Sequence, residues 1–143
     1  MKILVAVDDS PHSERAIEFV TRMRWPAGSR MIVANVTPAE VRTESSASGT
    51  GEVVAPQHGP CRDIITRAQN QLRDAGLSTE QRTAEGDPRE QLLELADRER
   101  VDLLVMGSRG HSTLARLMLG SVSSHAVGHA SCSVLVVKEI TRR

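Results

Sequence analysis

The chain alternates between short runs of apolar residues and longer segments in which apolar residues recur every three or four positions. The runs at 2–8, 30–36, 101–106 and 133–137 are rich in valine, isoleucine and leucine, which is typical of parallel strands covered on both faces. A more polar run at 78–84 is expected at a sheet edge. These five segments predict the strands of one sheet.

The segments between the strands have the periodicity of amphipathic helices. Ser10-Pro11 and Asp87-Pro88 have the cap and first-turn chemistry of helix starts, and a further helix is expected over 121–129. The predicted apolar stripes are Ala16, Ile17, Val20 and Met23, then Ile64, Ala68, Leu72 and Ala75, then Leu92, Leu93, Leu95 and Ala96. Alternating strands and helices predict an α/β fold with helices on both faces of a parallel sheet.

Between the second strand and the second helix, residues 43–59 are rich in serine, glycine and proline. We interpret this stretch as a flexible connection and not as a domain boundary, because the same α/β rhythm resumes after it. A chain of 143 residues suits one domain, so we expect residues 1–143 to form a single unit.

A glycine motif follows the run at 101–106. The segment Gly107-Ser108-Arg109-Gly110 and, nine residues later, Gly120-Ser121 give the pattern G-x2-G-x9-G-S. Glycines let a backbone come close to a ligand, and a helix N-terminus offers free N–H groups to an anion. The pattern therefore predicts a phosphate-binding turn, although a tight strand-to-helix turn with Ser121 as a helix cap is a simpler interpretation of the same residues.

The position of this motif favours a ligand site at one edge of the sheet. Residues 8–10 and 106–110 both follow predicted strands. Ligands of open parallel sheets bind beyond the carboxyl ends of the strands, where the strand order reverses. If the two strands are neighbours, both segments face one cleft.

Composition narrows the partners that we expect. Eighteen basic and eighteen acidic residues leave a formal net charge of zero, which gives no electrostatic reason to expect nucleic acid or an anionic membrane. Phe19 and Trp25 are the only aromatic residues apart from the histidines, too few for a base-stacking platform. Cys61 and Cys132 make no disulfide framework, and no targeting or membrane-spanning segment is recognisable. We expect a cytoplasmic protein.

Four segments together resemble the universal stress protein family, in its ATP-binding branch. They are residues 7–10 (VDDS), 105–110 (VMGSRG), 120–123 (GSVS) and 134–137 (VLVV). The resemblance extends from about residue 3 to residue 138. It implies a five-stranded parallel sheet of order 3-2-1-4-5, a Rossmann-like arrangement, and a homodimer that pairs through the last strand, Val134–Val137.

The resemblance also implies a set of nucleotide contacts. Asp8 would hold the adenosine end of ATP, and the distal phosphates would bring Mg²⁺ or Mn²⁺ into the site. Val7, Val36 and Met106 would line the adenine pocket; Gly107, Arg109 and Gly110 would wrap the ribose and α-phosphate; Gly120, Ser121, Val122 and Ser123 would bind the distal phosphates.

The function that this resemblance implies is that of an ATP-binding regulatory protein of the stress response. Nucleotide occupancy would switch the conformation of the 107–123 loop and the choice of partners. Two alternatives stay open. One is a slow ATPase or an autophosphorylating enzyme using Ser121 or Ser123, although the sequence has no P-loop lysine and no paired base. The other is a dimeric adaptor that binds no nucleotide.

Two other observations bear on the site. Asp9 replaces the glycine usual in the family's first motif, where its carboxylate would either repel phosphate or cap the first helix. His125, His129 and Cys132 have helical spacing, yet we interpret them as a partly solvated helix face and expect no metal-binding set. We likewise expect His111 to be an exposed loop residue and not a general base.

Overall fold

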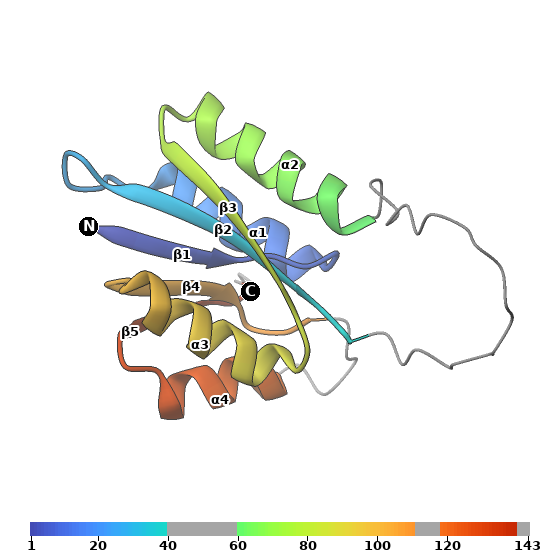
Figure 1. Cartoon of the computed structure of the whole chain (residues 1–143). Coiled ribbons are helices and arrows are strands. Elements are labelled where there is room, and N and C mark those ends of the chain that lie inside the picture. The colour runs from blue at the N-terminus through green and yellow to red at the C-terminus, as the bar shows by residue number, and fades with distance from the viewer. Residues whose placement is uncertain (40–59, 111–117, 140–143) are drawn as a thin grey trace, which may run out of the picture.

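Five parallel strands form one sheet in the computed structural model, which describes residues 1–39, 60–110 and 118–139, without the side chains of residues 60 and 61 (Figure 1). The strand order is β3-β2-β1-β4-β5, which confirms the predicted fold class and topology. The strands are β1 (Lys2–Ala6), β2 (Arg30–Thr37), β3 (Ser78–Glu85), β4 (Leu103–Gly107) and β5 (Ser133–Val137). The expected connection at 43–59 lies outside the described residues.

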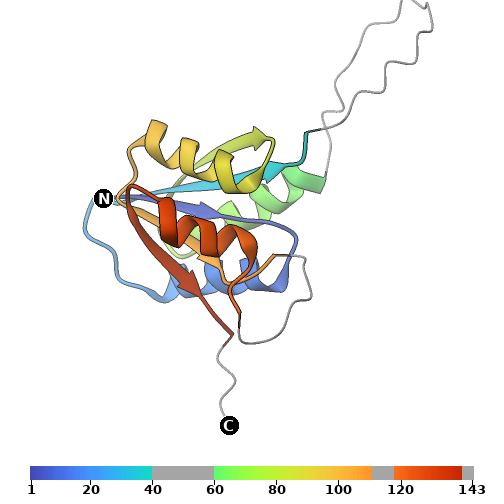
Figure 2. The ribbon, with the colours of Figure 1, turned by 90° about the horizontal axis from the view of Figure 1, so that it is seen from below.

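Four helices cover the two faces of this sheet among the described residues. They are α1 (Pro11–Arg22), α2 (Pro60–Asp74), α3 (Pro88–Glu99) and α4 (Ser121–His129). Helices α1 and α2 pack together on one face, and α3 and α4 pack together on the other (Figures 1 and 2). Ser10 caps α1 and Asp87 caps α3, each followed by proline, as the sequence predicted.

The alternation of side chains along the central strand divides the core into two halves. Ile3 and Val5 of β1 pack toward α1 and α2, whereas Leu4 packs toward α3 and α4. All three side chains are fully buried, because β1 has a helix layer on each face and a strand on each side. The apolar sequence of this strand is thereby explained.

Three helix and strand ends differ from the sequence prediction. Helix α1 ends at Arg22, and the side chain of Met23, 44% exposed, stands outside the core. Ala75 is exposed just after α2, which ends before the positive φ of Gly76. The strand expected from residue 101 begins at Leu103, because Arg100 is in the left-handed conformation and Val101 donates its N–H to the carbonyl oxygen of Ala96.

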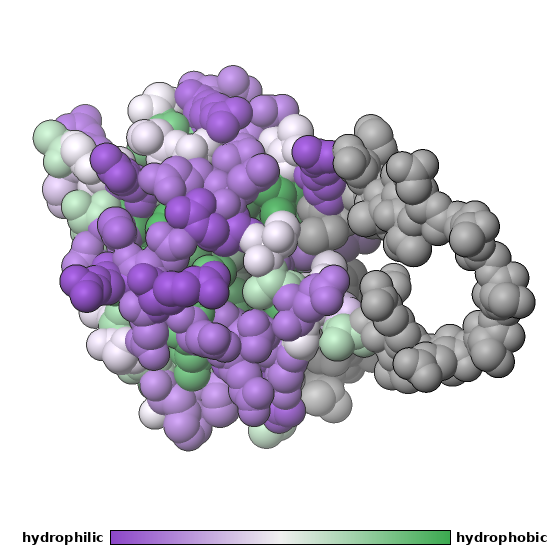
Figure 3. All heavy atoms as spheres, in the orientation of Figure 1, coloured by the Kyte–Doolittle hydropathy of each residue, from purple (hydrophilic) through white to green (hydrophobic). Residues whose placement is uncertain are grey.

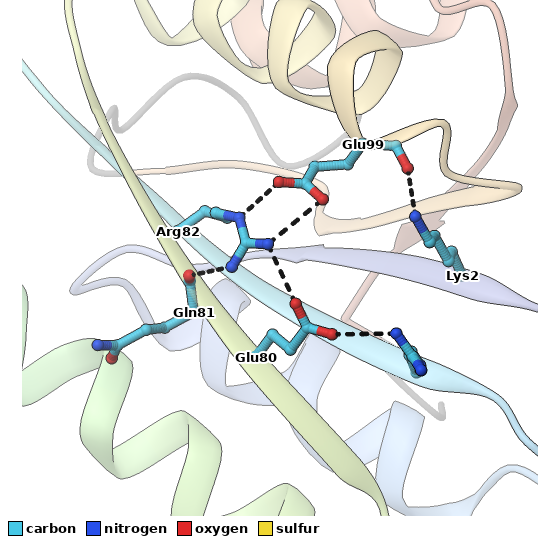
Figure 4. A network of polar contacts seen from close by, with 6 residues as sticks. Lys2, Glu80, Gln81, Arg82 and Glu99 are labelled. Carbon is cyan, nitrogen blue, oxygen red and sulfur yellow. Dashed lines mark hydrogen bonds and ion pairs between the residues drawn. The ribbon is translucent and has the colours of Figure 1, made fainter.

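The two edges of the sheet differ in chemistry. On β3, Arg82 donates hydrogen bonds to Glu99 at the end of α3 and to Glu80 on its own strand (Figure 4). The Arg82 guanidinium holds the pKa of the Glu99 carboxyl below its usual value, mainly through this hydrogen bond. The face that carries β3 is mostly hydrophilic (Figure 3). Strand β5, by contrast, is an edge of half-buried valine and leucine.

Candidate functional site

A pocket of about 340 Å³ lies at the carboxyl ends of β1, β2 and β4, on the side of the sheet covered by α3 and α4. Strands β1 and β4 are direct neighbours, so the segments that follow them meet there as expected. The pocket is lined by Ala6, Val7, Asp8, Ser13, Ala34, Val36, Pro38, Pro88, Leu92, Met106, Gly107, Arg109, Gly110, Gly120, Ser121, Val122 and Ser123.

Asp8 is fixed by the start of α1. Its Oδ1 accepts a hydrogen bond from the backbone N–H of Ser10 at 2.9 Å and another from the Ser10 hydroxyl. Its own N–H donates to the hydroxyl of Ser13 at 3.0 Å. The second carboxylate oxygen, Oδ2, lies against Gly110, where a Cβ atom would stand only 2.9 Å from it. Among the residues that line the pocket, Asp8 supplies the one carboxylate and Arg109 the one guanidinium.

The glycines of the motif have different structural roles. A Cβ atom at Gly107 would lie 2.7 Å from the backbone carbon and oxygen of His12, so glycine is needed where β4 passes under α1. A Cβ atom at Gly110 would instead meet the side chain of Asp8. Gly120 precedes α4 as its N-cap, and a Cβ atom there would lie 3.3 Å from the Cα atom of Arg109.

Two hydrogen bonds tie the residue after β4 to the start of α4, and a third ties it to the end of β5. The carbonyl oxygen of Ser108 accepts from the N–H of Gly120 at 2.8 Å and from the hydroxyl of Ser123 at 2.8 Å. The N–H of Ser108 donates to the carbonyl oxygen of Val137 at 2.9 Å. Ser123 is only 2% exposed, and its hydroxyl also lies within hydrogen-bond distance of the Gly120 carbonyl. This hydroxyl therefore joins the two ends of the 108–120 loop.

Helix α4 presents its N-terminus to the pocket without a side-chain cap. Gly120 is the N-cap and has no side chain to accept the first N–H groups, whereas Ser10 and Asp87 cap α1 and α3 with their own oxygens. The first turn of a helix leaves N–H groups without intrahelical partners. Residues 121–123, which line the pocket, supply those groups, so this end of the pocket is suited to an anion.

The rest of the lining is apolar. Val36 and Pro38 come from the end of β2, and Pro88 and Leu92 come from the first turns of α3. An apolar wall opposite an anion-binding helix end suits a ligand with a flat apolar body and a negatively charged tail. Near this wall, hydrogen bonds from the Arg89 guanidinium and backbone N–H hold the pKa of the Asp87 carboxyl below its usual value.

Comparison with known proteins agrees with this architecture. A model of the "Universal stress protein family" matches residues 1–138. The chain belongs to this family. Universal stress protein YxiE of Bacillus subtilis is 32% identical over 147 residues, covering 96% of this chain and 98% of YxiE.

Two solved structures resemble this universal stress protein over nearly its full length. The structure of protein MJ0577, from Methanocaldococcus jannaschii, has a TM-score of 0.77 and 24% identity, covering 99% of this chain and 97% of that one. A universal stress protein in complex with cAMP has a TM-score of 0.72 and 28% identity, covering 96% of each chain. The first likeness shows the fold; the second also concerns a nucleotide-bound relative.

All eleven site residues that the sequence proposed line the one pocket of this universal stress protein described above. Ala6, Ser13, Ala34, Pro38, Pro88 and Leu92 line it as well and were not foreseen. Ser13 lies only three residues after the 7–10 segment. Its hydroxyl, so close to that segment in the sequence, was a signal that could have identified it. The α3 residues carry no local signal, because only the packing of α3 against β2 brings them to the pocket.

Asp9 neither caps α1 nor lines the pocket. The side chain that caps α1 belongs to Ser10, so the expectation of Asp9 as a cap is wrong. Asp9 does not line the 340 Å³ pocket; it is exposed and faces a much smaller hollow between α1 and α2, beside Glu14 and Arg67. An effect of its charge on a bound phosphate stays a prediction.

The remaining candidates are separate from the pocket. The imidazole rings of His125 and His129 stack with their centroids 4.3 Å apart, and burial raises the pKa of the half-buried Cys132 thiol. Within residues 1–39, 60–110 and 118–139, no three histidine, cysteine or acidic side chains come together as metal ligands. No helix in the described part of the chain is long and apolar enough to span a membrane. His111 lies outside the described residues.

Proposed function

We propose that this universal stress protein binds ATP in the pocket at the ends of β1 and β4 and acts as a cytoplasmic regulatory protein of the stress response. The observation that carries the proposal is that eleven residues from four separate chain segments line one pocket. The pocket, about 340 Å³, falls in the usual size range of small-molecule sites. The relative solved in complex with cAMP, 28% identical, supports an adenine nucleotide as the ligand class.

The lining suggests how the nucleotide lies. Adenine packs against Val7, Val36 and Met106, with Asp8 accepting a hydrogen bond from the adenosine end. Gly107, Arg109 and Gly110 surround the ribose and α-phosphate. The distal phosphates accept hydrogen bonds from the backbone N–H groups of residues 121–123 at the start of α4. The N–H of Gly120, which was also expected to bind phosphate, instead donates to the carbonyl oxygen of Ser108, so Gly120 lines the site without supplying this donor.

A Mg²⁺ or Mn²⁺ ion would be held mainly through the phosphates of ATP. Mg²⁺ usually binds proteins through one or two carboxylates, water and substrate phosphates. Asp8 is the one carboxylate in the pocket lining, and its Oδ1 already accepts two hydrogen bonds from Ser10. The described residues thus suit a cation that arrives with the nucleotide.

The regulatory role requires that ATP distinguishes two states of the protein. A ligand shifts a conformational equilibrium only when it binds the two states unequally. The loop between Ser108 and Gly120 has both ends tied together next to the phosphate position. We propose that phosphate contacts bias this loop, most of which lies outside the described residues, and thereby change which partners bind.

The same proposal includes a homodimer that pairs through β5. Ser133 donates to Asp102 and Val137 accepts from Ser108, so both direct their backbone groups toward β4. In a strand the alternate residues, Val134 and Val136, then direct their N–H and C=O groups to the open edge. An aliphatic edge with open backbone groups favours pairing with a second copy, and the charged β3 edge does not.

Ser121→Glu tests the nucleotide site with little risk to the fold. Ser121 is exposed and lines the pocket at the first turn of α4. A carboxylate there stabilises the helix by about 0.3–1 kcal/mol, but it repels phosphate. At a separation of roughly 6 Å, one pair of like charges costs about 0.7 kcal/mol in water and about 3 kcal/mol at an effective dielectric of 20. We therefore expect ATP affinity to fall about 3- to 100-fold while thermal stability is kept or raised.

Ser124→Glu is the matched control, because Ser124 is exposed on the same helix but does not line the pocket. Both variants are compared with the unaltered protein, stripped of nucleotide, by calorimetric titration with Mg²⁺ and ATP. Equal affinity for ATP in both variants would contradict the phosphate position. If the folded, unaltered protein binds no nucleotide, the ATP proposal is wrong and a dimeric adaptor becomes the better account.

A further inference from the structure

Four hydrogen bonds link Asp8 and two buried serines, Ser10 and Ser13, at the start of α1. The Ser10 N–H and hydroxyl both donate to Asp8 Oδ1, and the Asp8 N–H donates to the Ser13 hydroxyl. The Ser13 N–H in turn donates to the Ser10 hydroxyl oxygen at 3.2 Å. Ser10 is 2% exposed and Ser13 is 3% exposed. The bonds form a closed set, because each of the three residues is bonded to both of the others.

The Ser10 hydroxyl has two roles in this set. Its oxygen accepts from Ser13 and thereby caps α1, and its hydrogen goes to Asp8. A cap needs only the accepting oxygen. The hydrogen bond to Asp8 is therefore an additional contact, one that fixes the rotation of the carboxylate and leaves Oδ2 beside Gly110.

We propose that Ser10 and Ser13 are positioning residues for nucleotide binding, which hold Asp8 so that one carboxylate oxygen faces the ligand. This inference rests on the proposed function. A carboxylate only accepts hydrogen bonds, so the group that it recognises is a donor on the ligand, an amino or hydroxyl group of the adenosine. With Oδ1 occupied by Ser10, the oxygen that accepts from the ligand is Oδ2.

Ser13 also fixes the position of the Asp8 backbone at the end of β1. The chain leaves β1 at Ala6, and the Val7 N–H still bonds to the carbonyl oxygen of Ala34 at 2.8 Å. The next N–H, that of Asp8, is taken by the Ser13 hydroxyl and not by a neighbouring strand. Ser13 itself lines the pocket, so removing its hydroxyl loosens both the backbone and the wall at this point.

The test is a double-mutant cycle between Ser10 and Asp8, read by ATP titration and by thermal unfolding. We expect Ser10→Ala to weaken ATP binding about tenfold, the order of effect of one lost hydrogen bond to a charged group. Ser10→Thr keeps the hydroxyl and should bind within about twofold of the unaltered protein. In the Asp8→Ala background, Ser10→Ala should leave the affinity unchanged while still lowering the unfolding temperature.

Asp87→Ala separates positioning from simple loss of a helix cap. Asp87 caps α3, whose first turns also line the pocket, but its own side chain does not line it. Asp87→Ala should lower the unfolding temperature as Ser10→Ala does and leave ATP affinity within about twofold. Equal losses of affinity in these two variants would overturn the proposal, and so would full additivity of Ser10→Ala and Asp8→Ala. A lack of ATP binding by the unaltered protein would instead contradict the proposed function itself.

Discussion

Gly107 and Gly128 are the two glycines at which replacement by alanine should have opposite effects on stability. A Cβ atom at Gly107 would lie 2.7 Å from the backbone carbon and oxygen of His12 and 2.8 Å from its Cβ atom. Ordinary contacts of a Cβ atom begin at about 3.4 Å, so β4 and α1 would have to separate by several tenths of an ångström. The obstacle is backbone and cannot rotate away.

The magnitude follows from the cost of overpacking. Adding a methyl group to a close-packed site costs about 1–3 kcal/mol, and a rigid obstacle places Gly107→Ala toward the upper end. Reduced freedom of the unfolded chain offsets about 0.4–1 kcal/mol of this. The expected net loss is about 2 kcal/mol. For a chain of this length, 1 kcal/mol corresponds to about 3 °C, so the unfolding temperature should fall by about 6 °C.

Gly128→Ala is the matched comparison. Gly128 is exposed in α4, and a Cβ atom there would meet nothing within 4 Å. Alanine is favoured over glycine in a helix interior by about 0.5–1 kcal/mol, and Gly128 lies in the last turn of α4, so we expect the lower part of this range and a rise of about 1–2 °C. Thermal unfolding followed by circular dichroism, with urea unfolding as a check, measures both variants. If Gly107→Ala unfolds at or above the temperature of the unaltered protein, the close approach of β4 to α1 is not what requires glycine there.

Three further predictions concern the pocket, the β3 edge and the β5 edge. Gly110→Ala should weaken ATP binding more than it changes stability, because its Cβ atom would displace the carboxylate of Asp8 and not backbone; titration and thermal unfolding together check this. Glu99→Gln should lower the free energy of unfolding by up to about 1 kcal/mol at pH 7. Since Arg82 lowers the pKa of Glu99 in the folded state, the carboxylate stabilises the protein above the usual glutamate pKa of about 4.3 and stops doing so as the pH falls through the lowered value. Urea midpoints should therefore differ at pH 7 and converge as the pH falls below the lowered pKa of Glu99, and a constant difference would exclude the ion pair as the cause. Val136→Pro removes an outward N–H from β5 and should yield monomers in light scattering; an unchanged dimer would place the interface elsewhere.

The local sequence pattern was sufficient to predict the features that depend on the residues of a single helix or strand. The caps Ser10 and Asp87 and the apolar strands on either side of β1 were all predicted from short stretches of sequence. Met23 was misplaced because the helical period continues for one residue beyond the point where α1 ends at Arg22. Periodicity gives the face of a helix but not its last residue.

Only part of the pocket was predicted. Its motif residues follow strand ends in the sequence and were recognised, whereas the α3 residues of the opposite wall were not. Pro88 and Leu92 line it only because α3 packs on the β2 side of the sheet. The particular need for glycine at position 107 depends on the His12 backbone, 95 residues earlier in the chain, and no local pattern reveals such a contact. The contacts of individual motif residues with a ligand stay predictions until they are measured.

The hydrogen bonds that join Ser108 to Gly120 and Ser123 make the intervening segment a loop whose two ends are anchored to each other, independently of its length. Doubling the length of such a loop costs only about 0.6 kcal/mol of closure entropy. We therefore expect inserted residues, or even a reporter domain, to be tolerated between these anchors. Gly120 and Ser123 also line the pocket, so an insertion between the anchors would be joined to the protein next to the proposed nucleotide site, and we expect a reporter placed there to respond to ATP.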